Sequence, residues 1–242
     1  MRISLSIIFF SIFTTAFPQQ QADSLKTKLK TTATVSLNSN GIASIPAFSL
    51  GKPAIIASLS LVKNRFSYDP TLSYGLDLRP WVIDNWLHYL LIRKPLFELT
   101  AGFDVSAFGS RHVYSEGSAW EEQRYFTSSI SGVFRIFSKS KLTLAYWNDR
   151  GQEKESLLGN YFDIEGSRSD FRIGKNVLLS AGLQVFYIDY TGLNDGLFVS
   201  PKISTSVKNI PFSVFFQAIQ ALESDISPFP GFRWNIGVGY TL

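Results

Sequence analysis

Hydrophobic and polar positions alternate without a break from residue 231 to residue 242. The apolar positions are Phe232, Trp234, Ile236, Val238, Tyr240 and Leu242. Successive side chains of a β-strand point to opposite faces, so this pattern predicts a strand with one apolar face and one polar face. The edge of a soluble sheet is one interpretation. Three aromatic residues on the apolar face favour the other, a transmembrane β-barrel with lipid outside and water inside.

Similar alternation recurs along the chain in segments of about ten residues that are bounded by turn signals. The expected strands cover residues 30–38, 53–62, 66–78, 81–92, 96–108, 122–137, 141–149, 157–173, 177–190, 196–207, 211–223 and 231–242. The segment 157–173 alternates least, because polar residues from Asp163 to Asp170 interrupt its apolar face. The sequence therefore predicts an all-β fold, a transmembrane antiparallel β-barrel of about 12 strands, with a count between 10 and 14.

The expected connections between these strands are of two kinds. Short connections that each hold Lys or Arg cover residues 63–65, 93–95, 138–140, 174–176 and 208–210. Longer ones cover residues 39–52, 109–121, 149–156 and 224–230. Outer-membrane barrels have short periplasmic turns and longer external loops, so we expect both chain ends in the periplasm. The tight Arg79-Pro80 junction is an exception, because it falls on the outer side.

The start of the chain has the layout of a secretory signal peptide. Arg2 is followed by an apolar run from Ile3 to Phe13 and then by small residues. A retained membrane anchor is the alternative, but spanning a bilayer takes about 20 apolar residues. We expect a signal peptide over residues 1–17, cut between Ala16 and Ala22, a periplasmic lead-in over 18–28 and a barrel domain over 29–242. This predicts a protein of the cell outer membrane, exported by a cleaved signal peptide.

Composition agrees with a barrel in a membrane. Charged residues make up 17% of the chain, against about 25% in soluble proteins, and aromatic residues make up 15%. No segment after the expected signal peptide has the 18 or more apolar residues of a membrane-spanning helix. The chain has no cysteine, and a net charge of +4 gives little reason to expect nucleic acid. The expected partners are outer-membrane lipid, the barrel-assembly machinery during biogenesis and, as candidates, envelope proteins. No cofactor or metal is expected.

Three short segments carry a resemblance to a known group of proteins. Residues 41–53 (GIASIPAFSLGKP), 65–70 (RFSYDP) and 79–81 (RPW) form a pattern that resembles small bacterial outer-membrane β-barrel proteins of unassigned function. The resemblance implies the fold and the compartment, and it brings no catalytic or ligand residues. The segment 41–53 is rich in Pro and Gly, and it is either an external loop folded inward or an ordinary surface loop.

The polar faces of the predicted strands would line the lumen. The candidate lumen-lining residues are Asp69, Asp77, Asp84, His88, Glu98, Asp104, Arg135, Lys202 and Arg233. An acidic wall on the third to fifth strands would face a more basic wall, and the field between them would orient a charged solute. Alternatively, these charges pair and fill the interior together with Trp86, Phe108, Trp147, Phe198 and Phe215. Barrels of eight strands are filled and those of sixteen to eighteen are open, so twelve strands favour a narrow or largely plugged lumen.

Aromatic residues near the outer strand ends form a predicted membrane-interface girdle, because amphipathic rings favour that interface. They are Trp81, Phe108, Trp120, Tyr125, Tyr187, Tyr190, Phe232 and Trp234.

The sequence contains few candidate residues for an enzymatic mechanism. His88 and His112 are the two histidines. His88 and Asp84 lie about 13 Å apart along a strand, too far for a dyad. His112 lies in a predicted outer loop with Glu116 and Glu121, where Ser110 or Ser115 would complete a catalytic set. There is no G-x-S-x-G elbow, phosphate loop or zinc spacing. The carboxylates at 163, 165 and 170 lack the spacing of a calcium loop, which favours a solvated rim.

Three hypotheses of function follow. The first is a narrow solute channel or carrier with a charged, partly filled lumen, in which Asp84, Glu98, Asp104, Lys202 and Arg233 tune selectivity. The second is a non-conducting barrel that serves as a scaffold or partner-binding subunit of an envelope complex. The third is a barrel hydrolase or acyltransferase that uses His112.

Overall fold

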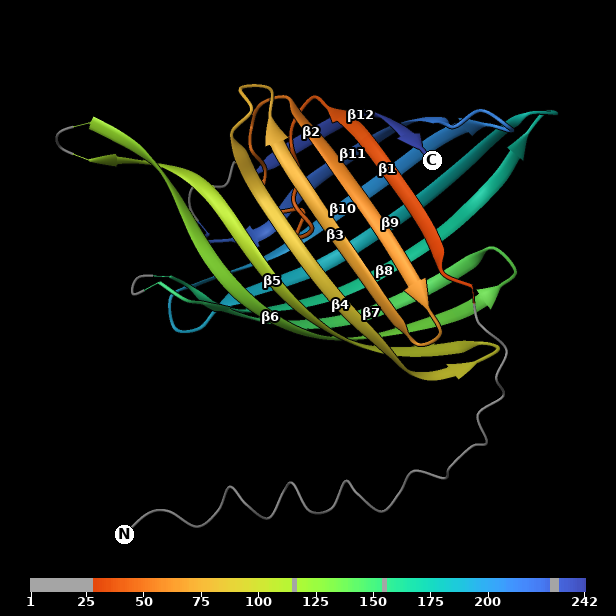
Figure 1. The fold of residues 1–242 in the computed structure, drawn as a ribbon, viewed down its shortest axis with the longest axis horizontal. Coiled ribbons are helices and arrows are strands. Elements are labelled where there is room, and N and C mark those ends of the chain that lie inside the picture. The colour runs from red at the N-terminus through yellow and green to blue at the C-terminus, as the bar shows by residue number, and fades with distance from the viewer. Residues whose placement is uncertain (1–27, 115–116, 154–155, 227–230) are drawn as a thin grey trace, which may run out of the picture.

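Twelve antiparallel strands close into one barrel (Figure 1). The computed structural model describes residues 28–114, 117–153, 156–226 and 231–242. The strands are β1 (Lys30–Asn38), β2 (Ala54–Lys63), β3 (Phe66–Gly75), β4 (Pro80–Lys94), β5 (Phe97–Tyr114), β6 (Gly117–Phe137), β7 (Ser140–Gly151), β8 (Leu158–Ile173), β9 (Val177–Tyr190), β10 (Asn194–Val207), β11 (Phe212–Ser224) and β12 (Phe232–Thr241). Within these ranges, no helix is long and apolar enough to cross a membrane.

The first and last strands complete the closure. Each strand pairs with its neighbours in chain order, and β1 pairs with β12 through contacts such as Val35 with Tyr240. Closure leaves no open sheet edge, and a sheet in hydrocarbon requires this because lipid cannot satisfy unpaired backbone groups. The predicted twelve-stranded antiparallel barrel is therefore confirmed.

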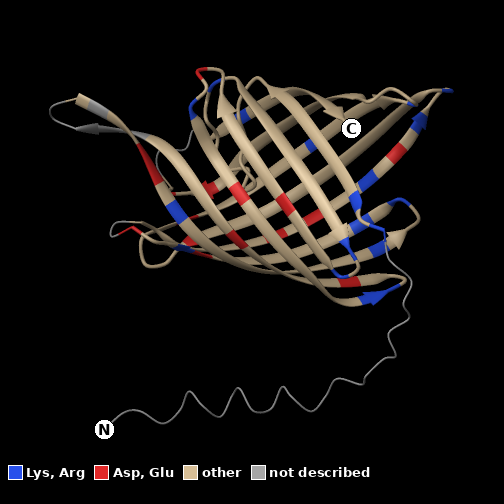
Figure 2. Cartoon of the chain, in the orientation of Figure 1, with Lys and Arg blue, Asp and Glu red and all other residues tan. Residues whose placement is uncertain are grey.

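The barrel has two different ends. At the end we call the turn end, the strands are joined by short connections: β2 to β3, β4 to β5, β6 to β7, β8 to β9 and β10 to β11. Left-handed residues lie in three of these turns: Asn64 at φ 58°, Gly174 at φ 70° and Asn209 at φ 65°. The start of β1 and the end of β12 lie at this end too, and Lys and Arg gather there (Figure 2). We call the opposite end the loop end.

The longest hairpin differs from the prediction. Residues 109–121 were expected to form a loop, but β5 continues to Tyr114 and β6 begins at Gly117, with pairs such as Arg111 opposite Trp120. The resulting arm projects past the rest of the barrel at its loop end (Figure 1). Pairing satisfies the backbone groups along this segment, whereas a loop would leave them to water. The predicted loop is therefore wrong over most of its length.

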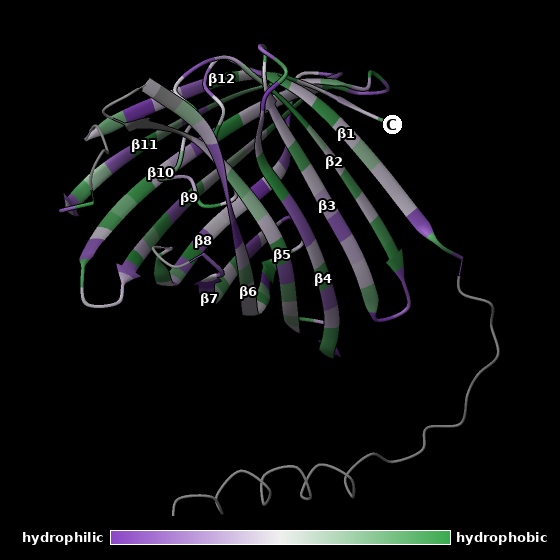
Figure 3. Ribbon diagram, turned by 60° about the vertical axis from the view of Figure 1, so that its left-hand side comes forward, coloured by the Kyte–Doolittle hydropathy of each residue, from purple (hydrophilic) through white to green (hydrophobic). Residues whose placement is uncertain are grey.

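Apolar side chains cover the outside of the barrel. On β12, Trp234 is 45% exposed whereas Asn235, which points inward, is 1% exposed. The same alternation of hydrophobic and hydrophilic residues follows the other strands (Figure 3). Exposed apolar groups around buried polar groups reverse the pattern of a soluble protein, and hydrocarbon around the barrel explains this reversal.

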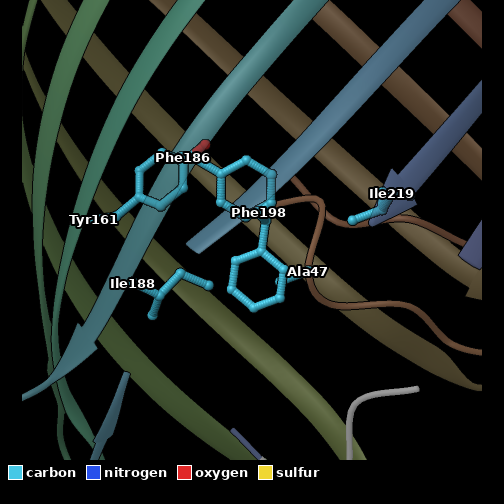
Figure 4. Packing of buried hydrophobic residues seen from close by; sticks show 6 residues of the cluster. All are labelled: Ala47, Tyr161, Phe186, Ile188, Phe198 and Ile219. Carbon is cyan, nitrogen blue, oxygen red and sulfur yellow. The ribbon is translucent and has the colours of Figure 1, made fainter. Parts of the chain in front are cut away.

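Residues 39–53, the inner loop, enter the barrel from the loop end. Backbone hydrogen bonds join Gly41 to Lys52 and Ala43 to Phe48, so the loop folds as a small hairpin. Its Ala47 is 3% exposed and belongs to an apolar cluster with four neighbouring strands (Figure 4). That cluster consists of Ala47, Tyr161, Phe186, Ile188, Phe198 and Ile219. Of the two sequence-based interpretations, the inward fold is the one that the structure shows.

Four predicted girdle residues face the interior instead. Trp81 is buried and packs edge-on against Phe108, because the register shifts at the start of β4 and turns it inward. Phe108, Tyr125 and Tyr190 all line a cavity in the lumen. Tyr125 alternates in step with inward-facing neighbours, and Tyr190 lies in step with buried Ile188. Proximity to a strand end therefore misplaced all four, because parity decides the face.

The other girdle residues do not lie in the lumen cavities. Phe232 and Trp234 are exposed on the outer face of β12. Tyr187 contacts Phe162, which is exposed, and donates a hydrogen bond to Asp195. Trp120 lies on the arm, with the Arg79 guanidinium 5.8 Å from its ring centroid.

Candidate functional site

The inner loop lies between two cavities in the lumen. The smaller one, here the acidic cavity, has a volume of about 210 Å³ and lies toward the loop end, between the inner loop and β4 to β7. The larger one, here the wide cavity, has a volume of about 650 Å³ and is lined by strands β8 to β12, β1 and β2. The lumen is therefore partly filled, with a different lining on each side of the loop.

Three carboxylates from three strands line the acidic cavity. Asp84 of β4 accepts a hydrogen bond of 2.7 Å from the Ser44 hydroxyl of the inner loop. Asp104 of β5 is 2% exposed and accepts a hydrogen bond of 2.6 Å from the Asn85 backbone N–H. Asp149 of β7 has a buried Oδ1 that finds no hydrogen-bond partner among the described residues. Among these residues, no Lys, Arg or His lines the cavity.

Aromatic rings form much of the remaining wall. Trp86 and Trp147 lie with their ring centroids 4.9 Å apart, and Tyr125, Tyr190 and Phe108 complete this wall. Tyr125 donates a hydrogen bond of 2.9 Å to Gln123, which also lines the cavity. The acidic cavity thus combines negative charge with π faces.

The wide cavity is polar and carries positive charge. Lys202 and Arg168 line it together with Glu165 and several serines. The Lys202 ammonium lies 5.0 Å from the centroid of the Phe215 ring, within the range of a cation–π contact. Buried Gln217 donates a hydrogen bond to Ser200 on the same wall. These groups suit the passage of water and polar solutes.

Four of the other predicted lumen residues form pairs with each other. His88 Nδ1 lies 2.9 Å from Asp69 Oδ2, and the imidazole stacks on Trp86. Glu98 pairs with Arg135 of the adjacent strand at 2.8 Å. Charges that pair across neighbouring strands contribute little to a field across the lumen. The net charge on the acidic and basic walls is therefore smaller than the sequence suggests.

The last two predicted lumen residues lie near the loop end. The Arg233 guanidinium donates to the backbone oxygen of Ser49, which ties β12 to the inner loop. Asp77 lies beyond the end of β3 and forms a 2.6 Å ion pair with Lys52, so its placement in the lumen was wrong. The hydrogen bond from Lys52 lowers the pKa of Asp77 below its ordinary value of 3.8. The chain turns at residues 76 and 77, and Leu78 follows in the left-handed region at φ 59°. The strand predicted over 66–78 therefore ends earlier, at Gly75.

Sequence reasoning missed Asp149, Ser44 and Tyr125 as cavity residues. Asp149 ends the predicted strand 141–149 and was not considered as a lumen residue, although continuing the alternation two residues beyond Trp147 would have placed it inward. No local signal identifies Ser44, because its contact with Asp84 depends on how the inner loop folds.

The structure gives less information on the candidate catalytic residues and on the three candidate calcium-binding carboxylates. His112 lies in β5, but its side chain is outside the described residues, as are residues 115–116 of the proposed catalytic set. Asp163 is buried and Glu165 lines the wide cavity, while Asp170 lies at a register shift in β8. In the described part of the chain, no group of three or more His, Asp or Glu side chains could hold a metal ion.

Solved structures with the same architecture are bacterial outer-membrane proteins. The KdgM porin in complex with disordered oligogalacturonate aligns with a TM-score of 0.56 at 11% identity, over 86% of this chain and 98% of the porin. An outer membrane channel from Pseudomonas putida F1 aligns with a TM-score of 0.54 at 12% identity, over 92% of this chain and 100% of the channel. This chain has the fold of bacterial outer-membrane β-barrels.

Sequence comparison adds no closer assignment for this barrel. No model of a protein family matches the sequence, and a search of curated proteins finds no match. At 11% and 12% identity, the structural likeness shows the fold alone. The properties of the lumen depend on the residues that line it in this chain.

Proposed function

We propose that this protein is a narrow solute channel or carrier of the outer membrane. The observation that carries the proposal is the inner loop, which leaves a cavity of about 210 Å³ and one of about 650 Å³ in the lumen. A lumen that only stabilised the barrel would be filled by side chains and would not need two cavities. The likeness in fold to a porin and to an outer membrane channel supports the same function.

The orientation follows from the two ends. Short turns of outer-membrane barrels face the periplasm, so the turn end and the end of β12 lie there and the loop end faces outward. Residues 1–17 serve as the cleaved signal peptide, and the barrel-assembly machinery inserts the mature chain. In this orientation a solute entering from outside meets the acidic cavity first and the wide cavity second.

Charge on the lumen wall sets the selectivity. Asp104 lies on the acidic cavity and Lys202 on the wide cavity, so the two sections favour ions of opposite sign. Glu98 contributes less than the sequence suggests, because Arg135 pairs with it.

Single-channel recording in planar bilayers tests this function. The refolded barrel should give small, discrete conductance steps. Asp104→Asn should shift the reversal potential toward anion preference and Lys202→Gln toward cation preference, because each removes one fixed charge from the path. Asp77→Asn is the control, since this carboxylate is paired with Lys52 outside the cavities, and it should leave selectivity unchanged. Silence from well-folded protein would contradict the channel and favour the scaffold hypothesis.

A further inference from the structure

We propose that the acidic cavity is a binding site for a small organic cation that carries an ammonium group and an apolar body. The proposal concerns binding, so it stands whether or not the barrel conducts.

The charge comes from Asp84, Asp104 and Asp149, which line one cavity. Burying carboxylates together is costly unless a positive charge lies among them, because water screens them poorly there. The described residues place no cationic side chain on the cavity wall, so the charge of these carboxylates is offset either by protons or by a cation that binds in the cavity.

Asp149 shows where the ammonium would bind. Its Oδ1 is buried without a hydrogen-bond partner among the described residues, although Thr127 forms a hydrogen bond with the same carboxyl group. Asp84 and Asp104 accept hydrogen bonds from Ser44 and from the Asn85 backbone. An unsatisfied buried acceptor costs free energy, and an N–H donor from a ligand would satisfy it. Because Oδ1 is closed to solvent, the Asp149 carboxyl would turn toward the cavity to accept this hydrogen bond.

The aromatic wall selects an organic cation. Trp86 and Trp147 both line this space, and aromatic rings attract an ammonium group within about 6 Å of the ring centroid. Phe108 and Tyr190 add apolar surface for the body of the ligand. A hydrated inorganic ion would gain nothing from these walls.

The size of the cavity limits the ligand. A cavity of roughly 150 Å³ accommodates benzene, so a volume of about 210 Å³ suits a ring with one short ammonium-bearing arm. Ser44, on the inner loop, holds one of the carboxylates. Binding in the cavity would thus bear directly on the loop that separates it from the wide cavity.

A charge series of ligands of nearly equal size tests the site. The full-length barrel, purified in a neutral detergent, is titrated by calorimetry with benzylammonium, benzyl alcohol and benzoate at neutral pH. Benzylammonium should bind at least about tenfold more tightly than benzyl alcohol, and benzoate should not bind, because only the ammonium satisfies the carboxylates. Equal affinity for all three would show apolar partitioning and overturn the proposal.

Matched variants locate the binding. Asp149→Asn should weaken benzylammonium binding by about tenfold or more, and Asp104→Asn, which keeps an oxygen acceptor for the Asn85 N–H, should weaken it as well. Glu165→Gln is the control, because it removes a carboxylate of the wide cavity. Loss of binding in Glu165→Gln, or no loss in either aspartate variant, would overturn the proposal. Displacement of benzylammonium by calcium at equal concentration would also overturn it, since the site would then be inorganic.

Discussion

At the scale of single residues, close approaches inside the barrel fix which side chains are tolerated. Gly41 lies at the start of the inner loop, and a Cβ on it would meet Trp81 Cζ3 at 2.9 Å and the Ala54 Cβ at 3.0 Å. Both neighbours are buried, so neither can move away without disturbing the wall. The glycine is therefore needed where the loop turns into the lumen.

We expect Gly41→Ala to destabilise the barrel by about 1–3 kcal/mol, because the added methyl group overpacks this contact. The midpoint of thermal unfolding in detergent measures the effect. Gly166→Ala is the matched control: nothing lies within 4 Å of its added Cβ, and its unfolding midpoint should stay unchanged. Equal stability of the two variants would contradict the packing described at Gly41.

At the scale of elements, the inner loop is anchored at the seam between β1 and β12. Asn235 of β12 accepts hydrogen bonds from the Asn40 backbone N–H at 3.0 Å and from the Ser39 hydroxyl at 3.3 Å. It donates to Asn38 at 2.9 Å. One buried side chain thus connects the two terminal strands and holds the base of the loop.

Asn235→Ala should cost about 1–3 kcal/mol of stability and also raise the conductance, because it leaves buried partners unsatisfied and frees the loop to move. Tyr146→Phe is the control, since it removes a hydrogen bond to Asn160 without touching the inner loop or either cavity. Its stability should fall by a similar amount while its conductance stays at the wild-type value. If both variants change the conductance alike, the loop does not control the path.

At the scale of the whole molecule, the outer surface is the apolar one. Ile203 on β10 is 51% exposed, while the next residue, Ser204, lines the wide cavity. Ile203 thus faces lipid and Ser204 faces the lumen. A charge introduced at each position should therefore affect the stability of the barrel differently.

Ile203→Arg should destabilise the folded barrel in lipid by about 2–4 kcal/mol, because it places a cation in hydrocarbon. Ser204→Arg should fold like the wild type, because its guanidinium reaches a polar cavity. Urea-dependent unfolding in phospholipid vesicles compares the two. A stable Ile203→Arg variant would mean that lipid does not surround this face.

Strand positions were accessible from sequence because they depend on local alternation. The predicted strand 177–190 matches β9 (Val177–Tyr190), and 30–38 matches β1 (Lys30–Asn38). The candidate site was accessible only in part. Asp84 and Asp104 were identified from the polar face of their strands, whereas the register shift that turns Trp81 inward has no signature in the alternation.

The sequence by itself determined that the chain is a barrel with an apolar exterior, because a two-residue period and short turns are properties of neighbouring residues. The tertiary structure alone decided what the lumen contains. Ser44 meets Asp84, and Asn40 meets Asn235, between residues 40 and 195 positions apart. Such contacts depend on closure of the barrel and on the path of the inner loop, and these bring together side chains that no local pattern connects.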